Sequence, residues 1–174
     1  MKPSLCTPVS LPILLLLIAL GIGILAPAHA TTTLNRAGLV IRLSDEAIIT
    51  RCVSFSEAQI SGAVLLERAE VTIEVLNDPA MGFFVCGIAG VGCPASNCMC
   101  AYPDATWGYW LRQTSGWRSS PVGASSRTVR PGDVDGWLWG QPSSSNAAPL
   151  PDLSFTAICG PAAQWQVWLP LIRR

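Results

Sequence analysis

Alternating apolar and polar residues predict short strands along the first half of the chain. Two runs rich in β-branched and apolar residues, Gly38–Leu43 and Ala47–Phe55, flank the polar triplet Ser44–Glu46, and this order predicts a β-hairpin. Val71–Val75 alternates as a strand with one solvent-exposed face does, and Phe83–Ile88 is a further predicted strand. The pattern therefore predicts a sheet-rich domain.

A short helix is predicted between these strands. Ser61 can accept a hydrogen bond from the first free backbone amides of a helix over Gly62–Glu70. Ile60 and Leu65 have the spacing of a hydrophobic staple around such a cap. A helix this short is stable only when it packs on a sheet. Its predicted inward face consists of Val64, Leu65 and Ala69.

The stretch Trp107–Gly140 holds five of the seven tryptophans and the clearest turn signals. Gly108–Arg112 and Trp117–Arg118 predict a second hairpin. Pro131 and Gly132 fit the two central positions of a type II turn, because proline fixes the first φ and glycine adopts the positive φ of the second. This turn leads into a predicted closing strand, Asp133–Trp139.

The first thirty residues predict a secretory signal-peptide helix. Lys2 supplies a positive start, Leu11–Leu25 is predominantly apolar, and Ala28-His29-Ala30 fits a cleavage site. An uncleaved membrane anchor is the alternative. Cleavage after Ala30 would leave 174 − 30 = 144 residues, enough for one domain, in a secreted or cell-surface protein.

Charge and composition of the expected mature chain exclude several function classes. The only histidine, His29, and the only lysine, Lys2, are removed with the signal peptide. The mature chain would therefore lack the commonest general base and the usual Schiff-base nucleophile. Ten arginines and eleven carboxylates give a formal charge of 10 − 11 = −1. We therefore expect no enzymatic activity, no nucleic-acid partner and, after cleavage, no membrane partner.

Six cysteines remain after cleavage, and an even count in an exported chain predicts a disulfide framework. The sequence leaves the pairing open, except that Cys98 and Cys100 are too close to bond each other comfortably. A zinc site built on Cys93, Cys98 and Cys100 is the alternative, but we expect no metal. The predicted disulfide cysteines are Cys52, Cys86, Cys93, Cys98, Cys100 and Cys159.

The closing strand carries the candidate chemistry. Asp133 and Asp135 would share one face as a glycosidase-type pair, or begin a calcium loop, but we expect Asp133 to cap the turn and Asp135 to face water. Trp137 and Trp139 share a face, with Leu138 on the other. If Leu138 faces the helix, the two indoles form an outer surface for a flat ligand or a partner protein; otherwise they fill the core.

Changes in composition divide the chain after residue 30 into a domain, a linker with a return segment, and a tail. We expect a domain over residues 31–140 and a Pro/Ser-rich linker with a return segment over residues 141–160. The return segment, Phe155–Cys159, would be anchored if Cys159 is bridged. Residues 161–174 form an apolar tail that is too short to span a bilayer and could dock to a partner.

One combination of motifs resembles a known family. A cysteine in the second strand, then CGIAGVGCPASNCMC, YW, GW with SPVGAS, and GDVDGWLWG are similar to a family of uncharacterised exported bacterial domains related to the C-terminal domain of transcobalamin and intrinsic factor. The resemblance covers Leu39–Cys159. It implies an α+β fold in which a β-grasp-like mixed sheet packs on one short helix and is stapled by disulfides.

The resemblance also implies a function. Relatives that bind cobalamin hold it between this domain and a helical barrel, which these 174 residues do not contain. We expect an exported non-enzymatic binding module for a corrinoid-like or other flat small ligand, with no resident cofactor. The alternative is a structural or protein-interaction module whose partner is a surface or transporter protein. The positions that match the family's ligand face are Trp110, Trp117, Gly123, Ala124, Ser125 and Trp137.

Overall fold

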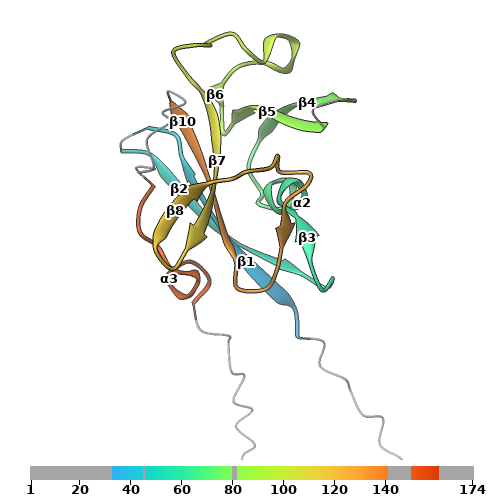
Figure 1. Cartoon of the computed structure of the whole chain (residues 1–174), viewed down its shortest axis with the longest axis vertical. Helices are drawn as coiled ribbons and strands as arrows, with labels where there is room; N and C mark the ends of the chain where they lie inside the picture. The colour runs from blue at the N-terminus through green and yellow to red at the C-terminus, as the bar shows by residue number, and fades with distance from the viewer. Residues whose placement is uncertain (1–32, 45, 80–81, 141–149, 161–174) are drawn as a thin grey trace, which may run out of the picture. The chain divides into compact units, whose positions relative to one another are not determined.

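The computed structural model describes residues 33–44, 46–79, 82–140 and 150–160. The predicted signal peptide and the apolar tail lie outside the described residues. A mixed five-stranded sheet forms the centre of the domain, in the order β2-β1-β10-β7-β8 (Figure 1). Its first and last long strands, β1 and β10, are parallel neighbours, and the other pairs are antiparallel. The strands are β1 (Asn35–Arg42), β2 (Ile48–Phe55), β7 (Thr106–Gln113), β8 (Gly116–Ser119) and β10 (Val134–Gly140).

Two smaller antiparallel sheets accompany the central one. Strand β3 (Ile60–Ser61) pairs with β9 (Thr128–Val129). Strands β4 (Ile73–Asp78), β5 (Gly82–Ile88) and β6 (Val91–Gly92) form the other sheet, with a register shift between Glu74 and Val75. β4 begins two residues later than the predicted strand Val71–Val75 and continues to Asp78. Both predicted hairpins, β1–β2 and β7–β8, are confirmed.

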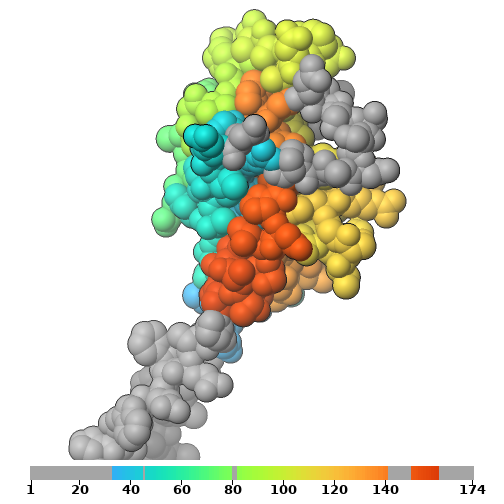
Figure 2. Space-filling view, turned by 90° about the vertical axis from the view of Figure 1, so that its left-hand side faces the viewer, coloured from blue at the N-terminus to red at the C-terminus, as the bar shows by residue number. Residues whose placement is uncertain are grey.

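The two faces of the central sheet carry separate apolar clusters because side chains alternate along each strand. Leu39, Ile41 and Trp137 point to the face that is covered by helix α2 (Gly62–Glu67). Val40, Trp110 and Leu150 belong to the opposite face, where the return segment packs. Figure 2 shows residues 150–160 lying between β2 and the β7–β8 hairpin.

Helix α2 begins where the sequence predicted but is shorter. The Ser61 hydroxyl accepts a hydrogen bond from the amide of Val64 at 3.2 Å, which confirms the cap. The helix ends at Glu67 because Glu70 adopts a left-handed φ of 54° soon afterwards. Leu65 and Ala69 are buried as predicted, but Val64 is only partly buried and Leu66 takes a core position.

The return segment, predicted without secondary structure, forms helix α3 (Phe155–Cys159). The hydroxyl of Ser154 caps it by accepting from the amide of Ala157 at 3.1 Å. The indole of Trp117 donates to the carbonyl of Pro151 at 2.9 Å, and Arg112 pairs with Asp152. Leu150 through Cys159 therefore belongs to the folded unit and extends it beyond residue 140.

Three disulfides staple the domain. Cys52–Cys159 joins β2 to α3 across 107 residues of sequence. Cys86–Cys98 fastens the loop around the 3-10 helix η1 (Ala95–Asn97) to β5, and Cys93–Cys100 ties the same loop to the residue that follows β6. The three bridges agree with the predicted framework, and Cys98 and Cys100 pair elsewhere as expected. The sheet-rich α+β class is thus observed, while the β-grasp assignment stays a prediction.

Candidate functional site

The Gly123–Ser125 corner is fixed to both α2 and β5. The carbonyl of Ala124 accepts from the amide of Ala63 at 3.1 Å, at the first turn of α2. The hydroxyl of Ser125 accepts from the amide of Phe83 at 3.0 Å. Ala124 is buried, whereas Gly123 and Ser125 are exposed. The corner therefore presents Ser125 to solvent at the junction of three segments that are distant in sequence.

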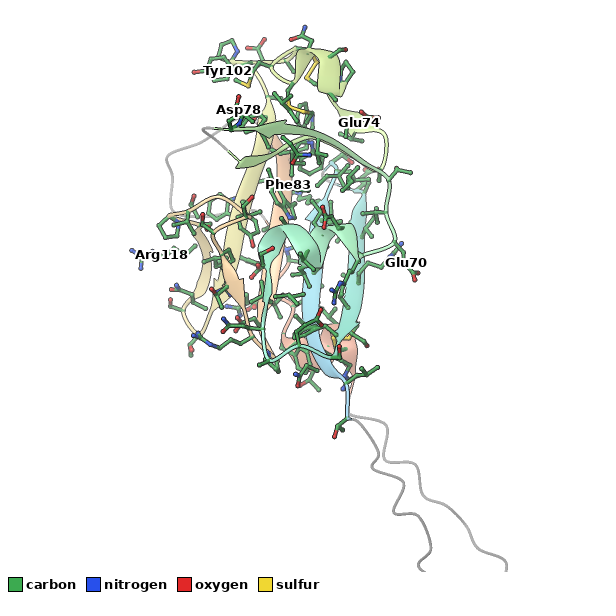
Figure 3. The ribbon with its side chains drawn as sticks, turned by 90° about the vertical axis from the view of Figure 1, so that its right-hand side faces the viewer. Glu70, Glu74, Asp78, Phe83, Tyr102 and Arg118 are labelled. Carbon is green, nitrogen blue, oxygen red and sulfur yellow. A yellow bond between two sulfur atoms is a disulfide. The ribbon has the colours of Figure 1, made fainter. Side chains whose placement is uncertain are left out.

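A groove of about 510 Å³ opens at this junction, between α2, the β4–β5 hairpin and the corner. We call it the α2–β5 groove. Phe83 and Val64 contribute apolar surface, and the hydroxyls of Ser61 and Ser125 contribute polar groups. Figure 3 shows Phe83 on the α2 side of the β4–β5 ribbon. The lining residues are Ser61, Ala63, Val64, Glu67, Asn77, Asp78, Pro79, Gly82, Phe83 and Ser125.

A charged network around the buried Asp135 anchors the segment that carries the corner. The guanidinium of Arg127 donates to Asp133 at 2.8 Å and to Asp135 at 3.3 Å. The hydroxyl of Tyr109 also donates to Asp135, which is 0% exposed. Asp133 caps the turn as expected, by accepting from the amide of Arg130 at 2.9 Å. The expectation that Asp135 faces water is wrong, because Tyr109 and Arg127 supply partners for a carboxylate inside the core.

The electrostatics of this network follow from burial. Removal from water raises the pKa of Asp135, against the opposing effects of the Tyr109 hydrogen bond and the Arg127 charge. Burial likewise raises the pKa of Tyr109 well above its ordinary value. The guanidinium of Arg127 keeps its charge throughout. The network therefore fits a structural anchor for the corner, since Asp135 has no exposed surface to offer a substrate.

The predicted tryptophans are divided between the two faces of the central sheet. Trp137 is 5% exposed and stacks on Tyr109, with ring centroids 4.6 Å apart, in the cluster under α2. Leu138 belongs to the opposite face, so β10 does not present an outer pair of indoles. Trp110 is 6% exposed, and Trp117 is partly buried, on the α3 side. The indole nitrogens of Trp110 and Trp137 meet no hydrogen-bond acceptor among the described residues.

The six predicted ligand residues therefore do not line one surface. Gly123, Ala124 and Ser125 lie on the same side of the sheet as Trp137, but only Ser125 lines the groove. Ligand contact by these residues stays a prediction. Phe83 and Val64 line the groove but were not among the predicted site residues. The sequence predicted Phe83 as the first residue of a strand, but nothing in the pattern paired it with Ser125.

Candidate metal ligands do not gather in the described part of the chain. Within residues 33–44, 46–79, 82–140 and 150–160, no group of three or more histidine, cysteine or acidic side chains could hold a metal ion. All six cysteines that the sequence singled out are in disulfides. In the same residues, no helix is both long and apolar enough to cross a membrane.

No protein-family model and no curated protein matches the chain. Among solved structures, it is similar to haptocorrin in complex with Cbi, at 13% identity and a TM-score of 0.46, over 64% of this chain and 26% of haptocorrin. It is also similar to a protein from Ruminococcus gnavus ATCC 29149, provisionally described as metal binding, at 15% identity and a TM-score of 0.44. That match covers 63% of this chain and 99% of the other. At these TM-scores, neither similarity places a ligand on this chain.

Proposed function

We propose that the protein is an exported, non-enzymatic binding module whose ligand occupies the α2–β5 groove. The observation that carries this proposal is the groove itself, about 510 Å³ of space where Phe83, Val64 and the hydroxyl of Ser125 converge. Binding sites for small molecules are mostly concave and apolar, with a few well-placed polar groups that orient the ligand. The groove combines the apolar side chains of Val64, Pro79 and Phe83 with polar ones, among them the hydroxyls of Ser61 and Ser125 and the carboxylates of Glu67 and Asp78.

The two groove hydroxyls are positioned by the fold and can still bond to a ligand. Ser61 accepts from the Val64 amide and Ser125 accepts from the Phe83 amide, so each oxygen is held in place. A hydroxyl that accepts such a bond keeps its own hydrogen to donate. Ligand acceptor groups, such as amide carbonyls, would meet these donors while an apolar face rests against Phe83.

A flat, corrinoid-like molecule is the ligand class we favour. The resemblance to transcobalamin-related domains is most specific at Gly123–Ser125 and at Gly132–Val134 with Trp137, and the first of these stretches borders the groove through Ser125. Because the indoles of Trp110 and Trp137 are buried, we expect the flat face of the ligand to rest on Phe83 instead. Three disulfides support export, because such bridges persist in oxidising compartments.

Equilibrium dialysis against cobinamide and cobalamin tests this proposal, with ligand absorbance as the readout. Phe83→Ala removes the groove ring, and Phe84→Ala is the matched control, because the adjacent residue points to the other face of β5 and does not line the groove. We expect saturable binding that Phe83→Ala weakens and Phe84→Ala leaves unchanged. No saturable binding, or equal loss in both variants with the fold intact, would contradict a corrinoid ligand in this groove.

A protein-interaction module is the second candidate function. The burial of Trp110 and Trp137 is what this alternative expects. Leu76, Met99 and Tyr102 are three of the six large hydrophobic side chains that are exposed among the described residues, and exposed apolar surface is what an interaction module needs. Affinity purification from the exported fraction, repeated with Tyr102→Ser, would favour this alternative if a partner is captured only by the unaltered protein.

A further inference from the structure

Strand β2 forms an open edge of the central sheet. It stands at the end of the strand order, and β1 is its only strand neighbour among the described residues. Its eight residues, Ile48–Phe55, pair with β1 in continuous register without a bulge and include no proline. Proteins commonly blunt such edges with proline, lysine or a bulge, because free backbone groups can pair with another strand. Only Arg51 shields this edge, where its guanidinium donates to the carbonyl of Thr50 at 2.9 Å.

The neighbouring ladder shows which backbone groups of β2 point outward. The amide of Gly38 donates to the carbonyl of Asp133 at 2.9 Å, so the backbone of Gly38 faces away from β2. Its antiparallel partner Cys52 therefore forms no ladder bond to β1, and the N–H and C=O of Cys52 point away from β1. The same holds for Ser54, two residues further on, whereas the intervening Val53 bonds to β1. Two successive outward positions are thus available to a further strand.

A groove of about 280 Å³ lies along this part of the edge, between residues 51–54 of β2 and residues 68–70 after α2. We call it the β2-edge groove. Consecutive side chains of a strand point to opposite faces, so a groove lined by four consecutive residues follows the strand's edge. Its cationic groups are Arg51 and Arg68, and the guanidinium of Arg68 is held by the carboxylate of Glu57 at 2.7 Å. Guanidinium planes stack on aromatic rings, so the groove suits an extended segment that carries an aromatic side chain.

The disulfide Cys52–Cys159 brings the start of the apolar tail to this edge. The Cα atoms of the two cysteines are 5.0 Å apart, and Cys159 is the last residue of α3. Figure 2 shows residues 150–160 against β2. The tail, residues 161–174, therefore begins two residues after a cysteine that is bonded to the edge strand itself. Five residues of extended chain span roughly 17 Å, which lets Gln164 reach the outward positions of β2.

The sequence of the tail has the pattern of a strand. Polar and apolar residues alternate over Gln164–Val167, and Trp168 and Leu169 follow before Pro170. Alternation predicts a strand, and a proline cannot donate to a ladder beyond it. The two tryptophans in this segment offer aromatic faces to the two arginines of the β2-edge groove. We propose that residues 164–169 add to the outer edge of β2 as a sixth strand of the central sheet, with a tail indole in the groove.

Amide hydrogen exchange of the full exported protein, followed by nuclear magnetic resonance, tests this assignment. The amides of Cys52 and Ser54 report on the edge, and the amide of Val53 reports on the intact fold because it bonds to β1. The double variant Gln166→Pro with Val167→Pro removes two neighbouring donors, one of which must face β2 because backbone groups alternate along a strand. Gln166→Thr with Val167→Ile is the matched control, because it keeps both donors and introduces residues that favour strands.

We expect the Cys52 and Ser54 amides to exchange about tenfold faster or more in the proline variant than in the unaltered protein and the control, because a paired amide exchanges only when its strand opens. Exchange at Val53 should be the same in all three proteins. Equal exchange of the Cys52 and Ser54 amides in all three would overturn the proposal. Protection that grows with protein concentration, together with a dimer in analytical ultracentrifugation, would place the tail on a second copy and would also overturn it. The outcome does not depend on the proposed ligand of the α2–β5 groove.

Discussion

The carboxylate of Asp135 accepts a hydrogen bond from the hydroxyl of Tyr109 inside the domain, and Asp135 has no exposed surface. Gly62, at the start of α2, lies directly over this hydroxyl. Arg127 reaches the same carboxylate from the segment that carries the Gly123–Ser125 corner. The pair therefore links the central sheet to the helix and to the corner, the two elements that border the α2–β5 groove together with the β4–β5 hairpin.

Gly62→Ala tests the close packing over Tyr109. A Cβ at this position would overlap the Tyr109 hydroxyl and lie 3.1 Å from the carbonyl of Ala124. We expect the free energy of unfolding to fall by about 1–3 kcal/mol, as overpacked sites typically show. Denaturant titration measures it. Gly123→Ala is the control, because a Cβ there meets nothing within 4 Å, and a similar loss in both variants would refute the packing argument.

The buried carboxylate predicts a pH dependence of stability. Because burial raises the pKa of Asp135 in the folded state, the folded protein binds its proton more tightly than the unfolded chain does. The free energy of unfolding relative to Asp135→Asn should therefore decrease as pH rises above the ordinary aspartate pKa of about 4. Denaturant titrations of both proteins across this range measure the difference. A relative stability that increases with pH would mean that Arg127 and Tyr109 outweigh burial.

The three disulfides should contribute unequally to the free energy of unfolding. Under the chain-entropy account, Cys52–Cys159, which spans 107 residues, should stabilise more than Cys93–Cys100, which spans 7, by about 2 kcal/mol. Paired serine variants of each bridge, compared by thermal unfolding, measure the difference. Equal losses would show that local packing outweighs loop length. Mass under non-reducing conditions should lack six hydrogens, two for each of the three bridges.

Export predicts a defined mature end. The apolar run before Ala28-His29-Ala30 should direct secretion and cleavage after Ala30. N-terminal sequencing of exported material should therefore begin at Thr31. Recovery of the protein with Met1 retained in a membrane fraction would support the anchor instead.

Local pattern predicted the elements better than the site. Alternation and turn residues located both hairpins, and Gly132 adopts the positive φ of 89° that the type II turn requires. Period-two alternation also placed Trp137 and Trp139 on one face of β10 and Leu138 on the other. Whether Asp135 faces inward depends on its hydrogen-bond partners Tyr109 and Arg127, which are 26 and 8 residues away in sequence. The sequence pattern did not reveal these partners.

The local sequence pattern could not predict the α2–β5 groove for the same reason. Ser125 and Phe83 are 42 residues apart, and α2 joins them only through the three-dimensional arrangement of the sheets. Helix α3 has five residues, too few to show helical periodicity, and depends on the Ser154 cap and the Cys52–Cys159 bridge. The sequence therefore predicted the Gly123–Ser125 corner as a ligand contact, which stays a prediction, but it did not point to the neighbouring Phe83 and Val64.

The location of a bound corrinoid tests the central claim most directly. Amide and indole signals of the exported protein are compared by nuclear magnetic resonance with and without cobinamide. We predict that the largest changes occur at the amides of Val64, Phe83 and Ser125, and that the Trp110 and Trp117 indoles on the α3 face are unaffected. Changes confined to those indoles, or no change at saturating ligand, would contradict a binding site in the α2–β5 groove.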